Sequence, residues 1–212
     1  MILYGSSLSP YVRKTLAFAA EKSITLELQA AGMGGGPPEF KLASPFGKMP
    51  GFKDGDFMIS DSTAIITYLE ALKPDPNLIP AEPKARARTI WYEEFADTIL
   101  TASMGKIFFN RVVAPKFLGR PGDEAAAVEA ETRELPGLMD YMETIAPASG
   151  FLVEDRLTLA DLAVASPFVN LAHCGIRCDA KTHPKAKAYV DAILARPSFA
   201  VWVAQENAVF AS

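Results

Sequence analysis

Residues 47–72 read GKMPGFKDGDFMISDSTAIITYLEAL, and this stretch decides the fold class. Asp54 and Gly55 stand between two short apolar runs. An Asp-Gly pair in that position is a strong signal for a β-hairpin, because both residues tolerate the backbone of a tight turn. The stretch therefore predicts two antiparallel strands, at 51–53 and 57–59.

The elements around the hairpin follow the order of a thioredoxin-like domain. Before it, residues 2–4 predict a short strand, residues 10–22 a helix with an apolar face, and the alternation over 24–29 a half-buried strand. After it, residues 62–72 predict a helix that turns Ile65, Ile66 and Leu69 inward. The order is β-α-β, then a loop or helix, then β-β-α, which predicts an α/β thioredoxin-like domain over residues 1–76.

The remainder of the chain predicts helices only. Four prolines between residues 74 and 83 mark a linker. Apolar positions at helical spacing over 90–102 predict one long helix, and Pro136 should kink or restart a later one. We expect an all-α bundle over residues 85–212.

One segment is expected at the centre of this bundle. Thr158 and Asp161 have the spacing of a capping box and open a helix to about Leu171 that is apolar nearly all round. His183-Pro184 then begins a last clear helix, which should end before Arg196.

Composition excludes several classes of function. The 212 residues carry 21 basic and 25 acidic side chains, a net charge of −4, with no basic stripe that would suit nucleic acid. The longest uncharged run, 162–176, is too short and too polar to span a bilayer, and the start of the chain has no basic segment typical of a secretion signal. Cys174 and Cys178 lack a second ligand pair, so we expect reduced cysteines, no metal site and a cytoplasmic protein.

Three turns carry the residues best suited to chemistry. Ser9-Pro10 begins the first helix, where free backbone N–H groups and the helix dipole favour an anion such as a thiolate. Met49-Pro50 precedes the hairpin and could hold a cis bond, and Asp61 opens the next helix. Taken singly, these residues could be helix caps and a plain turn. Together they could hold a short peptide with a thiol, an ammonium group and carboxylates.

Five segments resemble the cytosolic glutathione S-transferase superfamily, and in particular its bacterial serine-type members. They are SSLSPYVRK at 6–14, SPFGKMPGF at 44–52, DSTAIITYLE at 61–70, LTLADLAVA at 157–165 and HPKAKAYVDAILARPSF at 183–199. The resemblance implies that the protein is an enzyme, that glutathione is its co-substrate and that it forms a homodimer.

The resemblance implies that Ser9 hydrogen-bonds the glutathione sulfur. Omega-class and glutaredoxin-like relatives carry a reactive cysteine at this position, so serine favours chemistry by the thiolate of glutathione itself. The SSLS sequence also resembles the zeta class, whose motif points to Ser6 or Ser7 instead. Lowering a thiol pKa by about two units takes roughly 2.7 kcal/mol. One hydroxyl–thiolate hydrogen bond, at about 1.5–3 kcal/mol, and the helix dipole, at about 0.3–1 kcal/mol, can supply it.

The resemblance also assigns the rest of the glutathione site. Met49, through its backbone before a cis-Pro50, would pair with the cysteinyl backbone of glutathione. Asp61 and Ser62 would hold the γ-glutamyl end, and Lys48 would meet the glycine carboxylate.

The second substrate, a hydrophobic electrophile, is expected between the two domains. Candidate pocket residues are the apolar side chains Tyr11, Tyr92, Phe95, Met104, Phe108, Phe109 and Phe168. His173 and His183 are expected outside the site. Two alternatives to a transferase stay open: a glutathione-dependent isomerase, dehalogenase or ether-cleaving enzyme of aromatic catabolism, and a non-enzymatic glutathione-binding protein.

Overall fold

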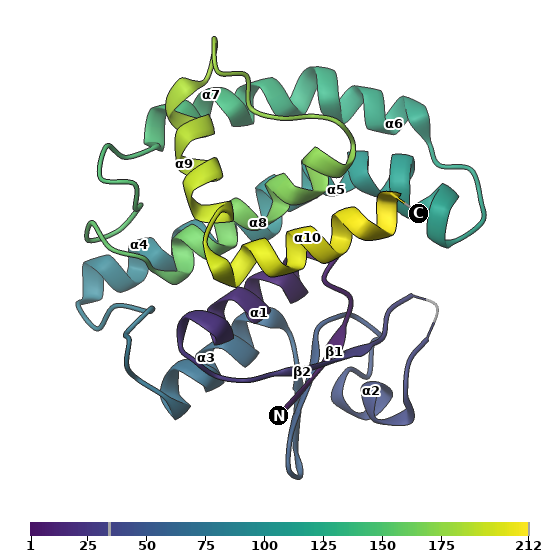
Figure 1. Cartoon of the computed structure of the whole chain (residues 1–212), viewed down its shortest axis with the longest axis vertical. Helices are drawn as coiled ribbons and strands as arrows, with labels where there is room; N and C mark the ends of the chain where they lie inside the picture. The colour runs from purple at the N-terminus through teal and green to yellow at the C-terminus, as the bar shows by residue number, and fades with distance from the viewer. Residues whose placement is uncertain (34, 212) are drawn as a thin grey trace.

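A four-stranded mixed sheet organises the first part of the chain in the computed structural model, which describes residues 1–33 and 35–211 (Figure 1). The strands are β1 (Ile2–Gly5), β2 (Glu27–Ala30), β3 (Gly51–Asp54) and β4 (Phe57–Ser60), in the spatial order β2-β1-β3-β4. β1 pairs with β2 in parallel, whereas the β1–β3 and β3–β4 pairs are antiparallel. The hairpin predicted around Asp54 and Gly55 is confirmed.

Three helices complete this sheet part: α1 (Pro10–Glu21), α2 (Pro38–Ala43) and α3 (Ser62–Leu72). α1 and α3 pack together and lie between the sheet and the helices above it, while α2 contacts β3 and β4 (Figure 1). The two predicted helices are confirmed, and α2 occupies the segment left as loop or helix. The strand predicted from residue 24 begins only at Glu27. The reason is that the Ile24 N–H closes the end of α1 by donating to the Ala19 carbonyl.

The helical part spans residues 83–211. The π-helical segment η1 (Phe95–Leu100) joins α4 (Pro83–Glu94) to α5 (Thr101–Phe108), and a second π-helical segment, η2 (Phe109–Phe117), continues the same long rod. α6 (Glu124–Glu129) continues through η3 (Ala130–Glu134) into α7 (Leu135–Ile145). Pro136 lies in the first turn of α7, which confirms the predicted restart.

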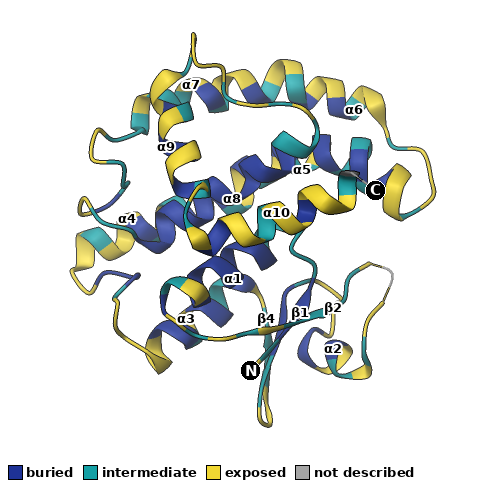
Figure 2. Cartoon of the chain, in the orientation of Figure 1, coloured by how far each residue is buried: buried dark blue, intermediate teal, exposed yellow. Residues whose placement is uncertain are grey.

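The helix α8 (Leu159–His173) is the centre of the molecule. Every residue from Leu159 to Leu171 is buried, as Figure 2 shows, and α8 contacts α1, α4, α5 and α9 (Pro184–Leu194). The prediction that the helix after His183 is the last one is wrong, because α10 (Pro197–Ala211) follows it. A proline in the first turn of a helix loses no hydrogen bond, because the N–H groups there have no acceptor within the helix. Pro197 can therefore begin α10 directly after α9 ends.

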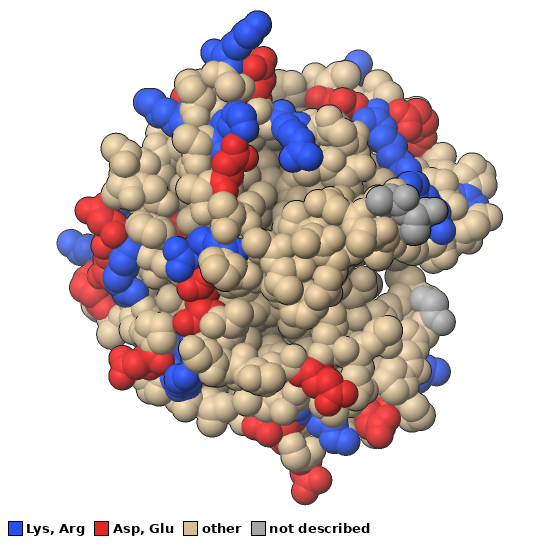
Figure 3. Space-filling view, in the orientation of Figure 1, with Lys and Arg blue, Asp and Glu red and all other residues tan. Residues whose placement is uncertain are grey.

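The two parts share one continuous hydrophobic core, which runs from Leu3 of β1 to Phe199 of α10. Figure 3 shows acidic and basic side chains interspersed on one face, with a largely uncharged surface along α10. Among the described residues, no helix has both the length and the apolar character needed to cross a membrane.

Asp161 holds the start of α8 from inside the core. Its carboxylate accepts hydrogen bonds from the N–H groups of Thr158 at 2.9 Å and Leu152 at 2.8 Å, and from the Tyr189 hydroxyl at 3.0 Å. Burial raises the pKa of Asp161, although these hydrogen bonds act in the opposite direction. The predicted capping arrangement thus extends to a loop and to α9.

We expect Asp161→Ala to lower the free energy of unfolding by about 3 kcal/mol, because the N–H and hydroxyl of Thr158, the Tyr189 hydroxyl and the part-buried Leu152 N–H lose their acceptor. The matched control is Asp123→Ala, which removes the exposed cap of α6 and should cost about 1 kcal/mol. Denaturant unfolding measures both. Equal losses would contradict this role for Asp161.

Candidate functional site

The sheet register brings the three predicted turns to one edge. Tyr4 near the end of β1 pairs with Gly51 at the start of β3, and Gly51 pairs with Ser60 at the end of β4. The turns that precede α1, β3 and α3 therefore lie side by side. The Met49–Pro50 bond is cis, as the sequence suggested.

Ser9 occupies the N-cap of α1. Its hydroxyl accepts a hydrogen bond from the Val12 N–H at 3.5 Å, which is long, and its own N–H donates to the Ser6 carbonyl at 3.0 Å. Gly5 makes the tight approach of α1 to β1 feasible, because a Cβ on Gly5 would lie 2.6 Å from a Val12 methyl carbon. None of the described residues accepts a hydrogen bond from the Ser9 hydroxyl, so this donor is available to a ligand.

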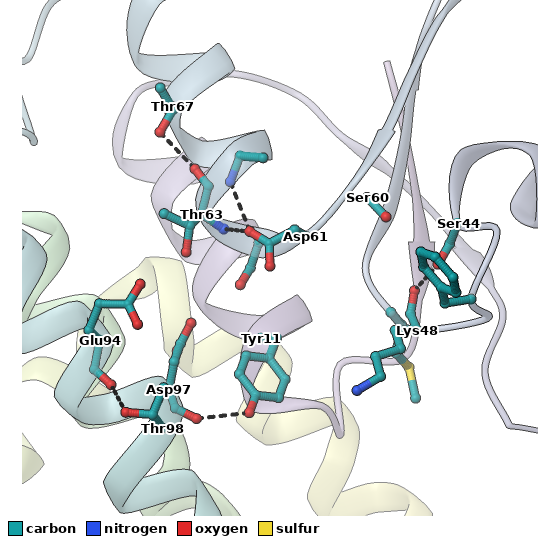
Figure 4. A pocket seen from close by; sticks show the side chains of 14 residues that line it. Tyr11, Ser44, Lys48, Ser60, Asp61, Thr63, Thr67, Glu94, Asp97 and Thr98 are labelled. Atoms are coloured by element: carbon teal, nitrogen blue, oxygen red, sulfur yellow. Dashed lines mark hydrogen bonds between the residues drawn. The ribbon is translucent and has the colours of Figure 1, made fainter.

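A polar cleft of about 980 Å³ opens between α3, η1 and the turn before β3 (Figure 4). Ser44 supports that turn, since its hydroxyl donates to the Lys48 carbonyl at 2.6 Å. The cleft is lined by Tyr11, Ser44, Phe46, Lys48, Met49, Ser60, Asp61, Ser62, Thr63, Ala64, Thr67, Glu94, Asp97 and Thr98. Four of the residues predicted for the glutathione site, Lys48, Met49, Asp61 and Ser62, thus line one cleft, and Pro50 directly follows Met49.

Charge is distributed unevenly in this cleft. Figure 4 shows the carboxylates of Asp61, Glu94 and Asp97 on one side, with Lys48 on the other. Asp61 adopts a φ of 82°, an unusual backbone for a residue other than glycine, and its carboxylate accepts from the N–H groups of Thr63 and Ala64. The cleft therefore suits a ligand with a cationic end and an anionic end.

Asp97 has an unusual environment. Its carboxylate accepts a 2.5 Å hydrogen bond from the buried Lys14 ammonium, which also bonds to Glu93 at 2.6 Å. Burial raises the pKa of Asp97 to about 6; the Lys14 charge opposes this shift, and Glu93 and Glu94 add to it. Sequence reasoning missed Asp97, because nothing in the local pattern distinguishes it from a solvated helix residue.

A second, apolar cavity of about 430 Å³ meets the cleft at Tyr11 and Met49, which line both. Its other lining residues are Ser6, Leu8, Ser9, Pro10, Ala31, Gly32, Met33, Gly105, Phe108, Phe109, Val113, Phe117 and Leu118. Ser6 and Ser9 both reach this cavity, whereas Ser7 is not among its described lining residues.

Tyr11 stands between the two cavities as a neutral group. Its hydroxyl donates to the Asp97 carbonyl at 3.0 Å, and burial, with the nearby Asp97 charge, raises its pKa. A phenol held in this way does not act as a base toward a thiol.

The predicted pocket residues divide into two sets. Tyr11, Phe108 and Phe109 line the apolar cavity, and their contact with an electrophile stays a prediction. Met104 and Phe95 are absent from the described lining of this cavity and belong to the core, and Tyr92 packs against that core, so their assignment to the pocket is corrected. Phe168 is also a core residue.

Three pocket residues that sequence reasoning missed, Gly105, Val113 and Phe117, have a sequence signal that they share with the predicted Phe109. Gly105, Phe109, Val113 and Phe117 recur at every fourth position along α5 and η2, and all four line the cavity. A helix presents residues four apart on one face, so this stripe marks the side of the rod that faces the cavity.

Neither cavity has a histidine or a cysteine among its described lining residues. His173 bonds to Glu206, and His183 precedes α9 and bonds to Asp140. Burial raises the pKa of the free thiols of Cys174 and Cys178 to about 11, so they are protonated near neutral pH. Within residues 1–33 and 35–211, no group of three or more His, Cys, Asp or Glu side chains could hold a metal ion.

The chain has a thioredoxin-like sheet part joined to a helical bundle. A polar cleft and an apolar cavity meet at the boundary between the two parts. This is the fold of the glutathione transferases. Residues 3–77 match the family model for the glutathione S-transferase N-terminal domain, and residues 109–206 match the model for the C-terminal domain. A glutathione S-transferase from Hyoscyamus muticus is 31% identical, over 94% of this chain and 95% of the relative.

Two further relatives agree. Glutathione S-transferase 3 from Zea mays is 30% identical, over 95% of this chain and 92% of the relative. The crystal structure of a glutathione S-transferase from Rhodospirillum rubrum has a TM-score of 0.84 at 24% identity, covering 93% of this chain and 89% of that one, and shows the same fold. The chain therefore belongs to the glutathione S-transferase family of enzymes.

The electrostatics of the cleft can be tested by NMR. We expect the side-chain carboxyl resonance of Asp97 to titrate with a midpoint of about pH 6, to vanish in Asp97→Asn, and to titrate at lower pH in Glu94→Gln, because the Glu94 charge raises this pKa. The folded state keeps this proton up to about pH 6 and the unfolded chain releases it near pH 4, so this group makes folding less favourable as pH rises between those values. A midpoint at the ordinary value for aspartic acid would contradict this account.

Proposed function

We propose that the protein conjugates the thiolate of glutathione to uncharged hydrophobic or aromatic electrophiles. The observation that carries this proposal is the junction at Tyr11 and Met49, where a polar cleft with charges at both ends meets an apolar cavity beside Ser9. A peptide in the cleft would present its central thiol at the junction. An apolar electrophile would approach from the other side.

The charges of the cleft favour one orientation of glutathione. The γ-glutamyl ammonium would lie toward Asp61, Glu94 and Asp97, and the glycine carboxylate toward Lys48. The hydroxyl and N–H of Ser62 suit the γ-glutamyl carboxylate, since a helix N-terminus favours an anion and the next two N–H groups already donate to Asp61. The central cysteine would then lie beside the Met49 backbone, which lines both cavities.

The Ser9 hydroxyl would stabilise the thiolate. Among the described residues, the Val12 N–H alone donates to it, over a long 3.5 Å, and the hydroxyl can donate its own proton to the sulfur. The hydroxyl stays protonated, so this is electrostatic stabilisation rather than base catalysis. The thiol proton leaves to solvent.

In the conjugation step the thiolate electron pair forms a bond to the electrophilic carbon. The leaving group departs with the electron pair of its own bond to that carbon, or, in an addition, those electrons move onto an activated double bond. The described side chains that line the apolar cavity are uncharged, so it suits an electrophile that needs no acid to activate it. The isomerase, dehalogenase, ether-cleaving and non-enzymatic alternatives receive no particular support from these features.

The family resemblance implies a homodimer, and we include this in the proposal. Phe46, at the rim of the cleft, is 91% exposed, and a second copy of the chain would give such a side chain a place to pack.

Ser9→Ala should reduce kcat/KM for an activated aryl chloride by about 10- to 100-fold near neutral pH, with little change in glutathione affinity. Such a loss corresponds to one hydrogen bond to a charged acceptor. Ser6→Ala and Ser7→Ala are the matched controls and should keep most of the activity. Activity that survives in Ser9→Ala and disappears in either control would refute the role of Ser9.

Asp61→Asn should weaken glutathione binding by about tenfold, because the cap of α3 survives in asparagine while the negative charge is lost. Calorimetric titration measures the affinity. Cysteinylglycine, which lacks the γ-glutamyl group, should bind wild type and Asp61→Asn equally. An equal loss for both peptides would show that the variant disturbs the cleft in general.

A further inference from the structure

A buried polar cluster lies directly behind the Ser9 turn and touches neither cavity. It consists of Arg13 of α1, Ser166 and Asn170 of α8, and Glu206 of α10, which we call the turn-holding cluster. All four residues are at most 2% exposed. They are absent from the described linings of both cavities, so the cluster acts on the site only through the residues that it holds.

The cluster hydrogen-bonds to the backbone on both sides of Ser9. The Asn170 amide donates to the Leu8 carbonyl at 2.7 Å, and the Ser166 hydroxyl donates to the Pro10 carbonyl at 2.8 Å. The cap bond to Val12 is long at 3.5 Å, so it fixes the Ser9 hydroxyl only weakly. The two donors from α8 therefore restrain this turn more strongly than the cap bond does, and they add to the backbone bond from the Ser9 N–H to the Ser6 carbonyl.

Arg13 orients both donors. Its guanidinium donates to the Asn170 side-chain oxygen at 3.1 Å and to the Ser166 hydroxyl oxygen at 3.3 Å. Because Arg13 occupies these acceptors, the Asn170 NH₂ group and the Ser166 proton are directed at residues 8 and 10. Hydrogen bonds from a charged donor also polarise the bonds that follow them in a chain.

Glu206 holds Arg13 from the last helix. The two side chains form a bidentate pair, with nitrogen–oxygen distances of 3.0 and 2.8 Å, and the His173 ring lies 2.9 Å from the same carboxylate. Burial opposes the Glu206 charge, but the His173 hydrogen bond and the Arg13 charge outweigh it and keep its pKa below the usual value. The His173 ring also lies 6.2 Å from that of Phe108, which lines the apolar cavity.

Packing alone does not account for such a cluster. Replacing a buried ion pair with apolar residues of similar volume is often neutral or stabilising, so an ion pair is a poor device for stability. Here the polar groups end on two backbone carbonyls that flank one hydroxyl. Because these hydrogen bonds hold the backbone next to the Ser9 hydroxyl, they indicate that the cluster positions this hydroxyl.

We propose that the turn-holding cluster positions Ser9 for stabilising the bound thiolate, so that α10, at the end of the chain, supports the chemistry at the start of α1. This inference rests on the proposed role of Ser9. Arg13, Ser166, Asn170 and Glu206 are positioning residues, since none of them reaches the ligand.

Ser166→Ala removes one donor with minimal change in volume. Asn170→Asp keeps the acceptor for Arg13 but loses the donor to Leu8. In each variant, we expect the pKa of the bound glutathione thiol to rise by about one unit, from about 6.5 to about 7.5, which leaves about threefold less thiolate at pH 7. At pH 6 or below, where the bound thiol is mostly protonated in every variant, glutathione affinity should change less than about twofold, because the cluster does not contact the peptide. The ultraviolet absorbance of the thiolate, followed against pH in the complex with glutathione, measures this pKa.

Ser103→Ala is the matched control. Ser103 is 2% exposed in α5, and its hydroxyl has no hydrogen-bond partner among residues 1–33 and 35–211. This variant should leave the thiol pKa at the wild-type value, and thermal unfolding of all three variants separates loss of fold from loss of position.

The outcomes are distinct. An unchanged thiol pKa in both Ser166→Ala and Asn170→Asp, or an equal rise in Ser103→Ala, overturns the inference while the proposed function stands. A wild-type protein that forms no thiolate band with glutathione overturns the proposed function itself.

Discussion

Helix α1 places two adjacent cations, Arg13 and Lys14, in the interior of the molecule. The arrangement of the two parts depends on the carboxylates that pair with these buried charges. Both side chains are at most 1% exposed. A buried charge without a partner is strongly destabilising, so each needs a carboxylate beside it. Glu206 pairs with Arg13 and Glu93 pairs with Lys14, and both acids belong to the helical part. The sheet part and the helical part are thereby held in one relative placement, which sets the shape of the cavities between them.

The Lys14 pairing also connects the framework to the cleft. Lys14 bonds to Asp97 as well as to Glu93, and Glu93 accepts a hydrogen bond from the Thr63 hydroxyl at the start of α3. One buried cation therefore links α1, α3 and the α4–η1 rod behind the acidic side of the cleft. The polar cleft and the apolar cavity lie on the two sides of Tyr11, whose hydroxyl is held by the backbone of the same rod. A thiol bound at this boundary would have the charged residues of the cleft on one side and an apolar substrate in the cavity on the other.

Local sequence predicted those elements whose signals lie within a few residues. Asp54-Gly55 marked the hairpin, and Thr158 with Asp161 marked the start of α8, because turn and cap chemistry is decided by neighbours in the chain. Local sequence failed at α10, where Pro197 has the same appearance whether it ends a fold or begins a helix. It also failed for Phe95 and Met104. The spacing of apolar residues along a helix is the same whether the apolar face packs in a core or lines a cavity. Only the packing of the rod against α8 distinguishes a core residue from a cavity residue.

The sequence by itself determined the α/β and all-α parts, the three turns that line the site, and the resemblance that names glutathione, because each of these depends on residues close together in the chain. Tertiary structure alone decided which aromatic side chains line the apolar cavity, where Asp97 stands relative to Lys14, and that Glu206 supports the turn of Ser9. These features join residues up to 193 positions apart. Their physical cause is burial, which turns distant charges and polar groups into obligatory partners.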